Sequence, residues 1–363
     1  MIALVLAAAA AVVAAPDPAR PGPHQSYETV ELAPGVVAFV APEGRTGTVQ
    51  GNTLAVIGRD GVLVVDTGQF PELTRRMIAD IRKRTDKPVR YVVNTHWHGD
   101  HLLGNSQFVD AFPGVTIVNH VETRRLADKA YTGFADKARK EFPQYVTDMR
   151  AAVARGTRKS GAALTADEKD YYARQADELE AALEQLSTFR YVRADAAFDR
   201  ELRVDLGGRE VAILHVGRGN TGGDTVVFVP DAKVVAAGDL VVYPTPYSFG
   251  SWLAEWPETL ARVEALGATA IMPGHGPVLR DHAYIDAVAG LIRETRRQVG
   301  AAVKEGLSLE DTRKRVTLDE YRRTLAADDY WRRRAFDEFF LQPAVEQAYK
   351  EAKGEPLQEG SEG

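Results

Sequence analysis

The pattern of apolar and polar positions predicts two blocks of β-strands, each accompanied by helices. Runs rich in Val, Ile, Leu and Thr, separated by Pro-Gly, Glu-Gly and Asp-Gly turn signals, predict strands at 27–32, 36–41, 53–57 and 62–65. A helix at 71–84 and a buried strand at 89–94 follow. The second block comprises strands at 202–206, 211–216, 225–229, 234–237 and 268–272, with helices at 257–266 and 284–304. Two such blocks indicate an α/β (α+β) protein in which two sheets pack face to face with helices outside.

Two further segments have a purely helical pattern. Between about 120 and 190 the chain is rich in Ala, Glu, Lys and Arg, and 167–186 carries apolar residues at helical intervals, which predicts an inserted pair or triplet of helices. Residues 301–353 are helical and highly charged and form a C-terminal extension, whereas 354–363 are predicted to be disordered. The main domain is therefore expected to span 27–300.

The first residues resemble a targeting signal. Residues 2–15 are entirely apolar, too short for a comfortable membrane span, and followed by a Pro-rich segment that cannot continue a helix. We therefore expect a cleaved signal peptide at 1–15, a linker at 16–26, and a periplasmic or secreted protein with no membrane attachment after cleavage. A retained anchor or a plain apolar extension is the alternative.

Composition restricts the chemistry. The 363 residues include no cysteine, so any transition metal must be held by imidazole and carboxylate groups. The net charge of −6 disfavours broad nucleic-acid binding, and we expect a small-molecule substrate instead. The oligomeric state is left open.

A cluster of potential metal ligands follows the strand at 89–94. Residues 94–101 read Asn-Thr-His-Trp-His-Gly-Asp-His, which places His96, His98, Asp100 and His101 within six positions. Alternate residues at a strand end point to one side, so His96 and His98 can converge on one ion. Imidazole with carboxylate suits zinc, and iron or manganese less exclusively.

This motif resembles the signature of the metallo-β-lactamase superfamily, and three later landmarks occur in that family's order. They are Asp66 in Val-Asp-Thr-Gly, Asp239 after Gly238, and His275 in Gly-His-Gly. The resemblance implies a four-layer αβ/βα sandwich. It also implies that His96 and His98 bind a first metal, that Asp100, His101 and His275 bind a second, that Asp239 bridges them, and that Asp66 supports the ligands from behind.

One position departs from the family pattern. Asn220 stands where the family supplies a further histidine to the first metal, and an amide oxygen is a poorer zinc ligand than imidazole. His215 is the alternative substitute. We therefore expect one tightly bound Zn²⁺ and a weaker second one. The glycines at 217, 219 and 222 match a dinucleotide fingerprint, but they precede a strand instead of a helix, which excludes that function.

The resemblance implies a zinc-dependent hydrolase in which a metal-bound hydroxide attacks a carbonyl of a β-lactam, lactone, ester or thioester, with Asp100 and Asp239 assisting. A class B-like β-lactamase is one member of this set. The alternatives are an iron-dependent oxidoreductase of the same fold and a non-catalytic metal-binding partner protein. Residues 45–51 are expected to form a flap by analogy with the family. Side chains expected to line a substrate pocket are Tyr243, Tyr247, Trp252 and Arg218.

Overall fold

The computed structural model describes residues 26–46, 48–185, 189–357 and 359. The expected signal peptide and nearly all of the expected linker lie outside these residues, as do positions 358 and 360–363 of the C-terminal tail. Within the described part of the chain, no helix combines the length and apolar character needed to cross a bilayer.

The first sheet has seven strands in sequential order, antiparallel from β1 to β4 and parallel from β4 to β7. Its central strands are short runs of Val, Leu and Ala that are buried along their length, as expected for strands covered on both faces. The strands are β1 (Glu28–Ala33), β2 (Val36–Val40), β3 (Thr53–Ile57), β4 (Val62–Val65), β5 (Val89–Val93), β6 (Thr116–His120) and β7 (Ala196–Phe198).

The second sheet has five strands in the order β12-β11-β10-β9-β8, with β11 and β12 parallel. The register between β11 and β12 is irregular on both sides of Gly238, so β11 is bulged near Asp239. The strands are β8 (Glu201–Asp205), β9 (Glu210–Leu214), β10 (Val226–Val229), β11 (Val234–Val242) and β12 (Ala270–His275), and a 3₁₀ turn, η3 (Pro230–Ala232), precedes β11.

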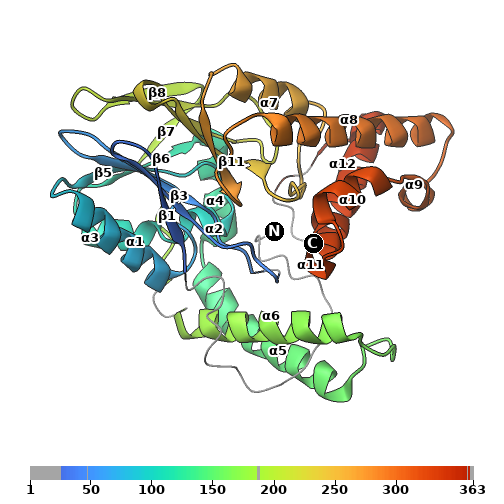
Figure 1. Ribbon diagram of the computed structural model, residues 1–363. Helices are drawn as coiled ribbons and strands as arrows, with labels where there is room; N and C mark the ends of the chain where they lie inside the picture. The colour runs from blue at the N-terminus through green and yellow to red at the C-terminus, as the bar shows by residue number, and fades with distance from the viewer. Residues whose placement is uncertain (1–25, 47, 186–188, 358, 360–363) are drawn as a thin grey trace.

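The two sheets pack against each other through a shared apolar core, and helices cover their outer faces (Figure 1). On the first sheet, α1 (Pro71–Arg84) and α3 (Asn105–Ala111) bury Met77, Ile81 and Phe108. On the second sheet, α7 (Trp256–Glu264) and α8 (Ala283–Lys304) bury a larger set that includes Leu260 and Ile292. This order of layers confirms the predicted αβ/βα sandwich.

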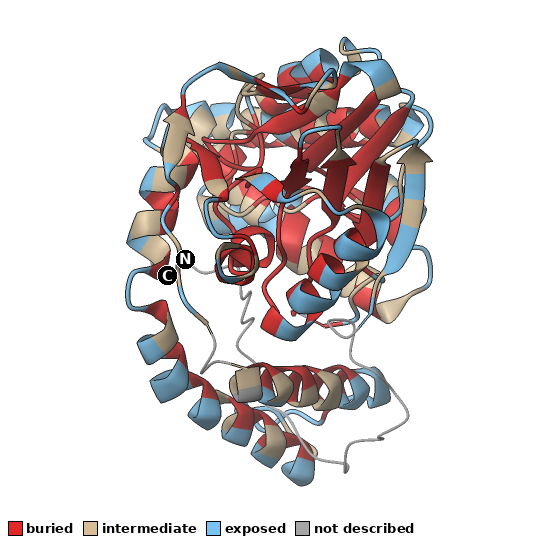
Figure 2. Cartoon of the chain, turned by 90° about the vertical axis from the view of Figure 1, so that its left-hand side faces the viewer, coloured by how far each residue is buried: buried red, intermediate tan, exposed pale blue. Residues whose placement is uncertain are grey.

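The helical insertion lies in the crossover between β6 and β7. It contains three helices, α4 (Val121–Tyr131), α5 (Phe134–Arg155) and α6 (Ala166–Gln185), of which α5 and α6 pack against each other beneath the sheets in Figure 1. Figure 2 shows that this pair is buried along its inner surfaces and exposed along its outer ones. Each helix therefore has one apolar face, as its sequence spacing predicts.

The C-terminal extension consists of short helices that pack on α8 and reach across to the insertion. They are α9 (Leu309–Arg315), α10 (Asp319–Ala326), α11 (Tyr330–Ala335), a π-helical turn η4 (Phe336–Leu341) and α12 (Gln342–Lys353). Contact with the insertion is made by five rings, which we call the aromatic cluster: Tyr171, Tyr247, Phe249, Trp331 and Phe339.

Most predicted elements lie within a few residues of their observed bounds. The elements with no counterpart in the sequence prediction are the strands β6 and β7, the helices α2 (Gly99–Leu102) and α3, and the 3₁₀ turn η3. The predicted strand at 234–237 is only the first part of β11, which continues to Val242 through the bulge at Asp239.

Candidate metal centre

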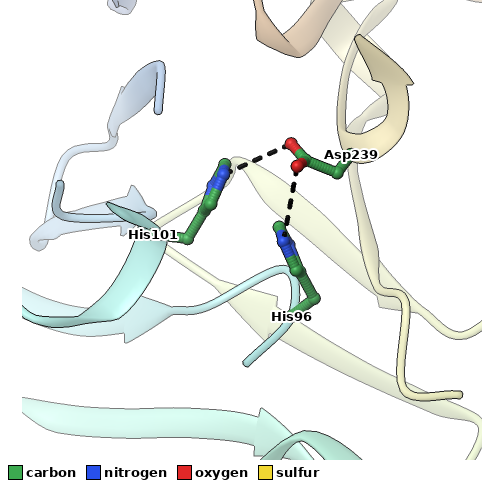
Figure 3. A group of neighbouring side chains, drawn as sticks. All are labelled: His96, His101 and Asp239. Atoms are coloured by element: carbon green, nitrogen blue, oxygen red, sulfur yellow. Dashed lines mark ion pairs between the residues drawn. The ribbon is translucent and has the colours of Figure 1, made fainter. Parts of the chain in front are cut away.

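The candidate ligands meet where strands of the two sheets end side by side. The segment after β5 supplies His96 and His98, and the short helix α2 (Gly99–Leu102) supplies Asp100 and His101. Asp239 comes from the bulge in β11 and His275 ends β12. All six side chains are buried. Figure 3 shows His96 and His101 pointing toward the two carboxylate oxygens of Asp239.

Six of the predicted residues form one continuous cluster with His101 near its centre. The Nε2 atom of His101 lies 3.2 Å from Oδ1 of Asp239, 3.3 Å from Nε2 of His275 and 3.4 Å from Oδ2 of Asp100. The other oxygen of Asp239 faces Nε2 of His96 at 3.6 Å. Two groups of three could each hold an ion: His96, His101 and Asp239, and Asp100, His101 and His275.

This grouping differs in two respects from the arrangement that the family resemblance implied. His101 was expected only at the second ion, whereas it belongs to both groups. His98 belongs to neither, and its Nδ1 atom lies 3.0 Å from Nε2 of His96. Asp239 stands between the two groups, with one oxygen toward each.

Asp66 fixes the orientation of two histidines. One of its oxygens accepts from Nδ1 of His101 at 2.8 Å and from the Thr95 hydroxyl at 2.8 Å, and the other accepts from the Thr95 amide. Since the Thr95 hydroxyl donates to Asp66, it accepts from Nδ1 of His96, 3.0 Å away. Both rings therefore carry their proton on Nδ1 and direct the Nε2 lone pair into the cluster.

Asp66 is held in an uncommon backbone conformation. It ends β4 with a φ of 57°, in the left-handed region, and is fully buried. Such a conformation in a non-glycine residue is found mainly where the surrounding structure enforces it, often at functional sites.

The buried carboxylates of the cluster favour positive charge on their neighbours. Burial disfavours the charged form of a histidine, yet the neighbouring carboxylates raise the pKa of His101 well above its usual value and that of His275 to about 9. Burial also opposes ionised carboxylates, yet these imidazoles hold the pKa values of Asp100 and Asp239 well below the usual range. By contrast, burial lowers the pKa of His98 to about 4, so its ring is neutral at pH 7.

A cation fits these atoms better than hydrogen bonding does. Oδ2 of Asp100 and Oδ1 of Asp239 are completely buried and have no hydrogen-bond partner. They face the Nε2 atoms of His101 and His275, and only a proton or a metal ion between nitrogen and oxygen can balance the buried negative charge there. Buried polar atoms are almost always satisfied, and a bound metal ion would satisfy all of these at once. Imidazole nitrogen and carboxylate oxygen are the donor set that zinc accepts.

Close approach of the backbone is required at two glycines around the cluster. A Cβ atom on Gly274 would lie 1.9 Å from Oδ1 of Asp239. A Cβ atom on Gly51 would lie 2.7 Å from the His101 ring. No side chain fits at either position without displacing a candidate ligand.

A small cavity of about 30 Å³, room for about one water, leads to His275. It is lined on one side by the 42–52 loop between β2 and β3, which contains the segment predicted as a flap, and on the other by Tyr243, Tyr247 and Trp331. Tyr247 packs on the His275 ring with the centroids 5.3 Å apart. Two of the four predicted pocket residues, Tyr243 and Tyr247, therefore line a space beside the candidate ligands.

The other two, Trp252 and Arg218, lie elsewhere. The Arg218 guanidinium stacks on the Trp252 ring at 3.7 Å from its centroid and bonds Glu255. Both residues line a separate hollow of about 590 Å³, so the structure divides the predicted pocket into two places. The sequence could not distinguish them, because all four residues lie within 35 positions of one another on loops near Asp239.

The comparisons with known proteins agree with this geometry. The family model of the metallo-β-lactamase superfamily matches residues 46–294, more than half of the chain. The chain belongs to the metallo-β-lactamase superfamily. The matched segment contains every candidate ligand as well as Asp66.

Superfamily members with similar sequence or structure include named hydrolases. The chain is 26% identical over 242 residues to a linear primary-alkylsulfatase of Pseudomonas, covering 65% of this chain and 43% of the relative. It spans about half the length of the curated relatives it matches. A sec-alkylsulfatase of Pseudomonas shares the fold at a TM-score of 0.61 and 15% identity over 90% of this chain and 50% of that one. A metallo-β-lactamase from Pontibacter korlensis shares it at 0.52 and 21% identity, over 74% and 99%.

The departure from the superfamily pattern at Asn220 is also visible in the structure. Nδ2 of Asn220 donates to the Tyr247 carbonyl at 2.7 Å, while its Oδ1 is buried without a hydrogen-bond partner. His215, the alternative, bonds the Asp224 carbonyl through Nδ1 at 2.7 Å and stacks on His120. His215 is thus engaged elsewhere, and Asn220 Oδ1 is the atom that remains free to accept.

Several residues that hold the centre were not predicted from the sequence. Asn52 donates to the carbonyls of Pro273 and Gly276 at 2.9 Å, which joins the 42–52 loop to the strand that carries His275. Asn94 donates to the His101 carbonyl at 3.0 Å. Asn94 stands at the start of the motif and could have been noticed there, whereas nothing local distinguishes Asn52.

Proposed function

We propose that this protein is a zinc-dependent hydrolase that cleaves a carbonyl compound or a sulfate ester. The observation that carries the proposal is the buried cluster of His96, Asp100, His101, Asp239 and His275, in which imidazole nitrogens and carboxylate oxygens converge on positions that a cation would fill. Imidazoles fixed by Asp66 are preorganised for a cation, which distinguishes this cluster from a loop of hydrogen-bonded histidines.

Zinc bound there would polarise a substrate oxygen and make water a nucleophile near neutral pH. The chain's own residues have separate tasks. Asp66 and Thr95 keep the Nε2 atoms of His96 and His101 aimed inward. Asp100 and Asp239 are the carboxylates placed to hold or move a proton at their unpartnered oxygens. Tyr243, Tyr247 and Trp331 supply apolar surface and exclude water on the side of His275.

The bond that is cleaved belongs to one of two classes. The first is a carbonyl compound, namely a β-lactam, lactone, ester or thioester. The second candidate is a sulfate ester of an alkyl chain, favoured by the alkylsulfatase relative and by the aromatic lining of the cavity. We also propose that the substrate is a small molecule reached in the periplasm or outside the cell, which N-terminal sequencing of exported protein would test.

Metal content per chain is the first test. Protein dialysed against micromolar zinc should retain about one ion tightly and a second more weakly, and Asn220→His should bring the content to about two by adding an imidazole ligand. His101→Ala should lose both ions because His101 belongs to both groups. His282→Ala, which removes a partly exposed histidine paired with Glu264, is the matched control. A wild type that retains no zinc contradicts the proposal.

A substrate panel then separates the classes. Zinc-loaded protein is assayed with a chromogenic cephalosporin, a homoserine lactone, a p-nitrophenyl ester, an acyl thioester and dodecyl sulfate. Turnover that disappears in His101→Ala and persists in His282→Ala assigns the class. Zinc-loaded protein that hydrolyses none of the five, while an oxygen electrode records consumption with iron, would favour an oxidoreductase instead.

A further inference from the structure

The larger hollow, which the proposed function does not use, contains a carboxylate of the chain itself. Its lining combines Trp252 and Gly222 with Leu357 and Glu359 from the end of the described chain. Nothing in its lining belongs to the candidate ligand set. The hollow therefore forms a second place at which a ligand could bind.

Three N–H groups converge on the carboxylate of Glu359. The indole Nε1 of Trp97 donates to Oε1 at 2.8 Å, and the Gly222 amide donates to Oε2 at 2.7 Å. The indole Nε1 of Trp252 donates to Oε2 at 3.4 Å. Donors of this kind form stronger hydrogen bonds with an ionised acceptor than with a neutral one. We call these three donors the N–H cradle.

The N–H cradle requires a glycine at position 222. A Cβ atom on Gly222 would lie 2.7 Å from Oε2 of Glu359 and 3.4 Å from Nε1 of Trp252. Any larger residue at this position would fill the space that the carboxylate occupies. The carbonyl of Gly219 accepts from the Trp252 amide at 2.8 Å, which holds one indole donor against the same turn.

The charges around the hollow favour an anion. Arg125, Lys129 and Arg218 line it, and the acidic side chains in its lining are Glu122 and Glu359 itself. Arg125 bonds Glu122, and Arg218 bonds Glu255. Without Glu359 the lining therefore carries three cationic side chains and one carboxylate.

Burial disfavours the ionised form of Glu359 in the N–H cradle. Burial and the like charge of Glu122 raise its pKa, although the three donors act in the opposite direction. Burial thus weakens the hold of the N–H cradle on this internal carboxylate. Its advantage is the high effective concentration that comes from being part of the chain.

We propose that the N–H cradle is a binding site for the carboxylate of a small organic acid, and that Glu359 occupies it as an internal competitor. Trp97 separates His96 from His98 in the sequence, so the cradle is joined to the candidate metal centre by one short segment of backbone. The proposal does not depend on the metal or on the hydrolytic reaction.

The test uses full-length protein and acetate as the probe, with sodium chloride at matched ionic strength as the reference. Indole N–H resonances of the four tryptophans are followed by NMR, with Trp97 and Trp252 assigned from Trp→Phe variants. In Glu359→Ala, acetate should shift these two resonances with saturation in the millimolar range. Wild-type protein should bind at least about tenfold more weakly, because its own carboxylate competes.

Two variants make the result specific. Glu355→Ala removes an exposed carboxylate from the same tail and should behave as the wild type. Glu359→Ala combined with Gly222→Ala should lose acetate binding by at least about tenfold, because the added methyl group fills the cradle. If Glu359→Ala disturbs the fold, as judged by the dispersion of the indole resonances, Glu359→Gln replaces it and should bind acetate more tightly than the wild type. Equal responses of wild type and both Glu359 variants, or shifts that chloride reproduces, would overturn the proposal.

Discussion

Asp66 orients two of the candidate ligands although it belongs to neither candidate metal group. Its carboxylate holds the ring of His101 directly and the ring of His96 through Thr95. Its left-handed backbone places the carboxylate behind both rings. A residue that binds no metal thus determines which nitrogen each of these histidines offers.

Asp66→Asn should weaken zinc binding by about 10- to 100-fold, the usual effect of losing a supporting carboxylate. The amide keeps one acceptor but presents an N–H to either His101 or Thr95, where two donors would then oppose each other. Competition with a chromophoric chelator measures the dissociation constant. Asp60→Asn, which alters an exposed carboxylate paired with Arg59, should leave it unchanged. Equal affinities in the two variants would remove Asp66 from the supporting network.

Among single residues, the sequence predicted those whose role can be recognised from their close neighbours in the chain. His96, His98, Asp100 and His101 are close in the chain, and their spacing alone indicated a metal site. Asp66, Asp239 and His275 were recognised because short motifs surround them. Asn52 was missed because its role consists of bonds to a strand more than 200 residues away, and Glu359 because its three donors come from three separate segments.

Among the elements, the 42–52 loop is held by both helical additions to the sandwich. Glu43 makes a two-bonded ion pair with Arg332 of α11, at 2.6 and 2.7 Å, and Arg45 pairs with Asp329 at 3.3 Å. Thr46 donates to Glu178 of α6. The loop that closes the cavity beside His275 is therefore fixed by the insertion on one side and the extension on the other.

Glu178 should make the stability of this contact depend on pH. Burial raises its pKa from an ordinary 4.5 to about 8. Folded protein thus holds a proton that the unfolded chain releases, so the free energy of unfolding falls as pH rises from about 4.5 to about 8. Glu178→Gln should match the wild type near pH 5 and exceed its stability by roughly 4 kcal/mol at pH 8.

Urea unfolding at a series of pH values measures this difference. The control is Glu180→Gln, on the same helix as Glu178, which removes an exposed carboxylate that pairs with Arg150 of α5. Its free energy of unfolding should depend on pH as steeply as that of the wild type. Parallel pH profiles for Glu178→Gln and the wild type would contradict the prediction.

Phe339, like Trp331, joins the extension to the rest of the aromatic cluster. Its ring packs edge-on against Tyr247 and Trp331, with centroids 5.3 and 5.5 Å away, and it is almost completely buried. Phe339→Ala should lower the free energy of unfolding by about 3–5 kcal/mol, as expected for a buried phenylalanine. Val121→Ala, at an exposed apolar side chain, should change it by less than about 0.5 kcal/mol. Thermal denaturation of the three proteins gives the comparison, and a Phe339→Ala curve that overlays the Val121→Ala curve would refute this role.

Element prediction succeeded where a segment has a strong pattern of its own. The predicted bounds of α1, β3 and β4 coincide with the observed ones, because turn signals and Pro71 mark their ends. The strands β6 and β7 were missed because each forms by parallel pairing with a neighbour distant in sequence. β7 has only three residues, Ala-Ala-Phe, and two of them have little preference for a strand.

For the whole molecule, zinc should act as a stabilising ligand of the folded state, because the six candidate ligands come from three separate segments that only the folded chain brings together. With free zinc at about 1,000 times its dissociation constant, the gain is about 4 kcal/mol. Calorimetry should show a melting temperature roughly 5–10 °C lower after treatment with a chelator. His282→Ala should show the same change, whereas His101→Ala should show little. A melting temperature that the chelator leaves unaltered would count against a metal in this cluster.

The position of the aromatic cluster also has a consequence for the order of events during synthesis. Every candidate ligand, from His96 to His275, leaves the ribosome before Trp331 and Phe339 have been made. Since chains grow from the N-terminus and begin to fold while they grow, the ligands can assemble and take up an ion while the way in is still open. Only then do α11 and η4 arrive to pack against Tyr247 and pin the 42–52 loop. The elements that hold the 42–52 loop from this side are thus translated after every candidate ligand.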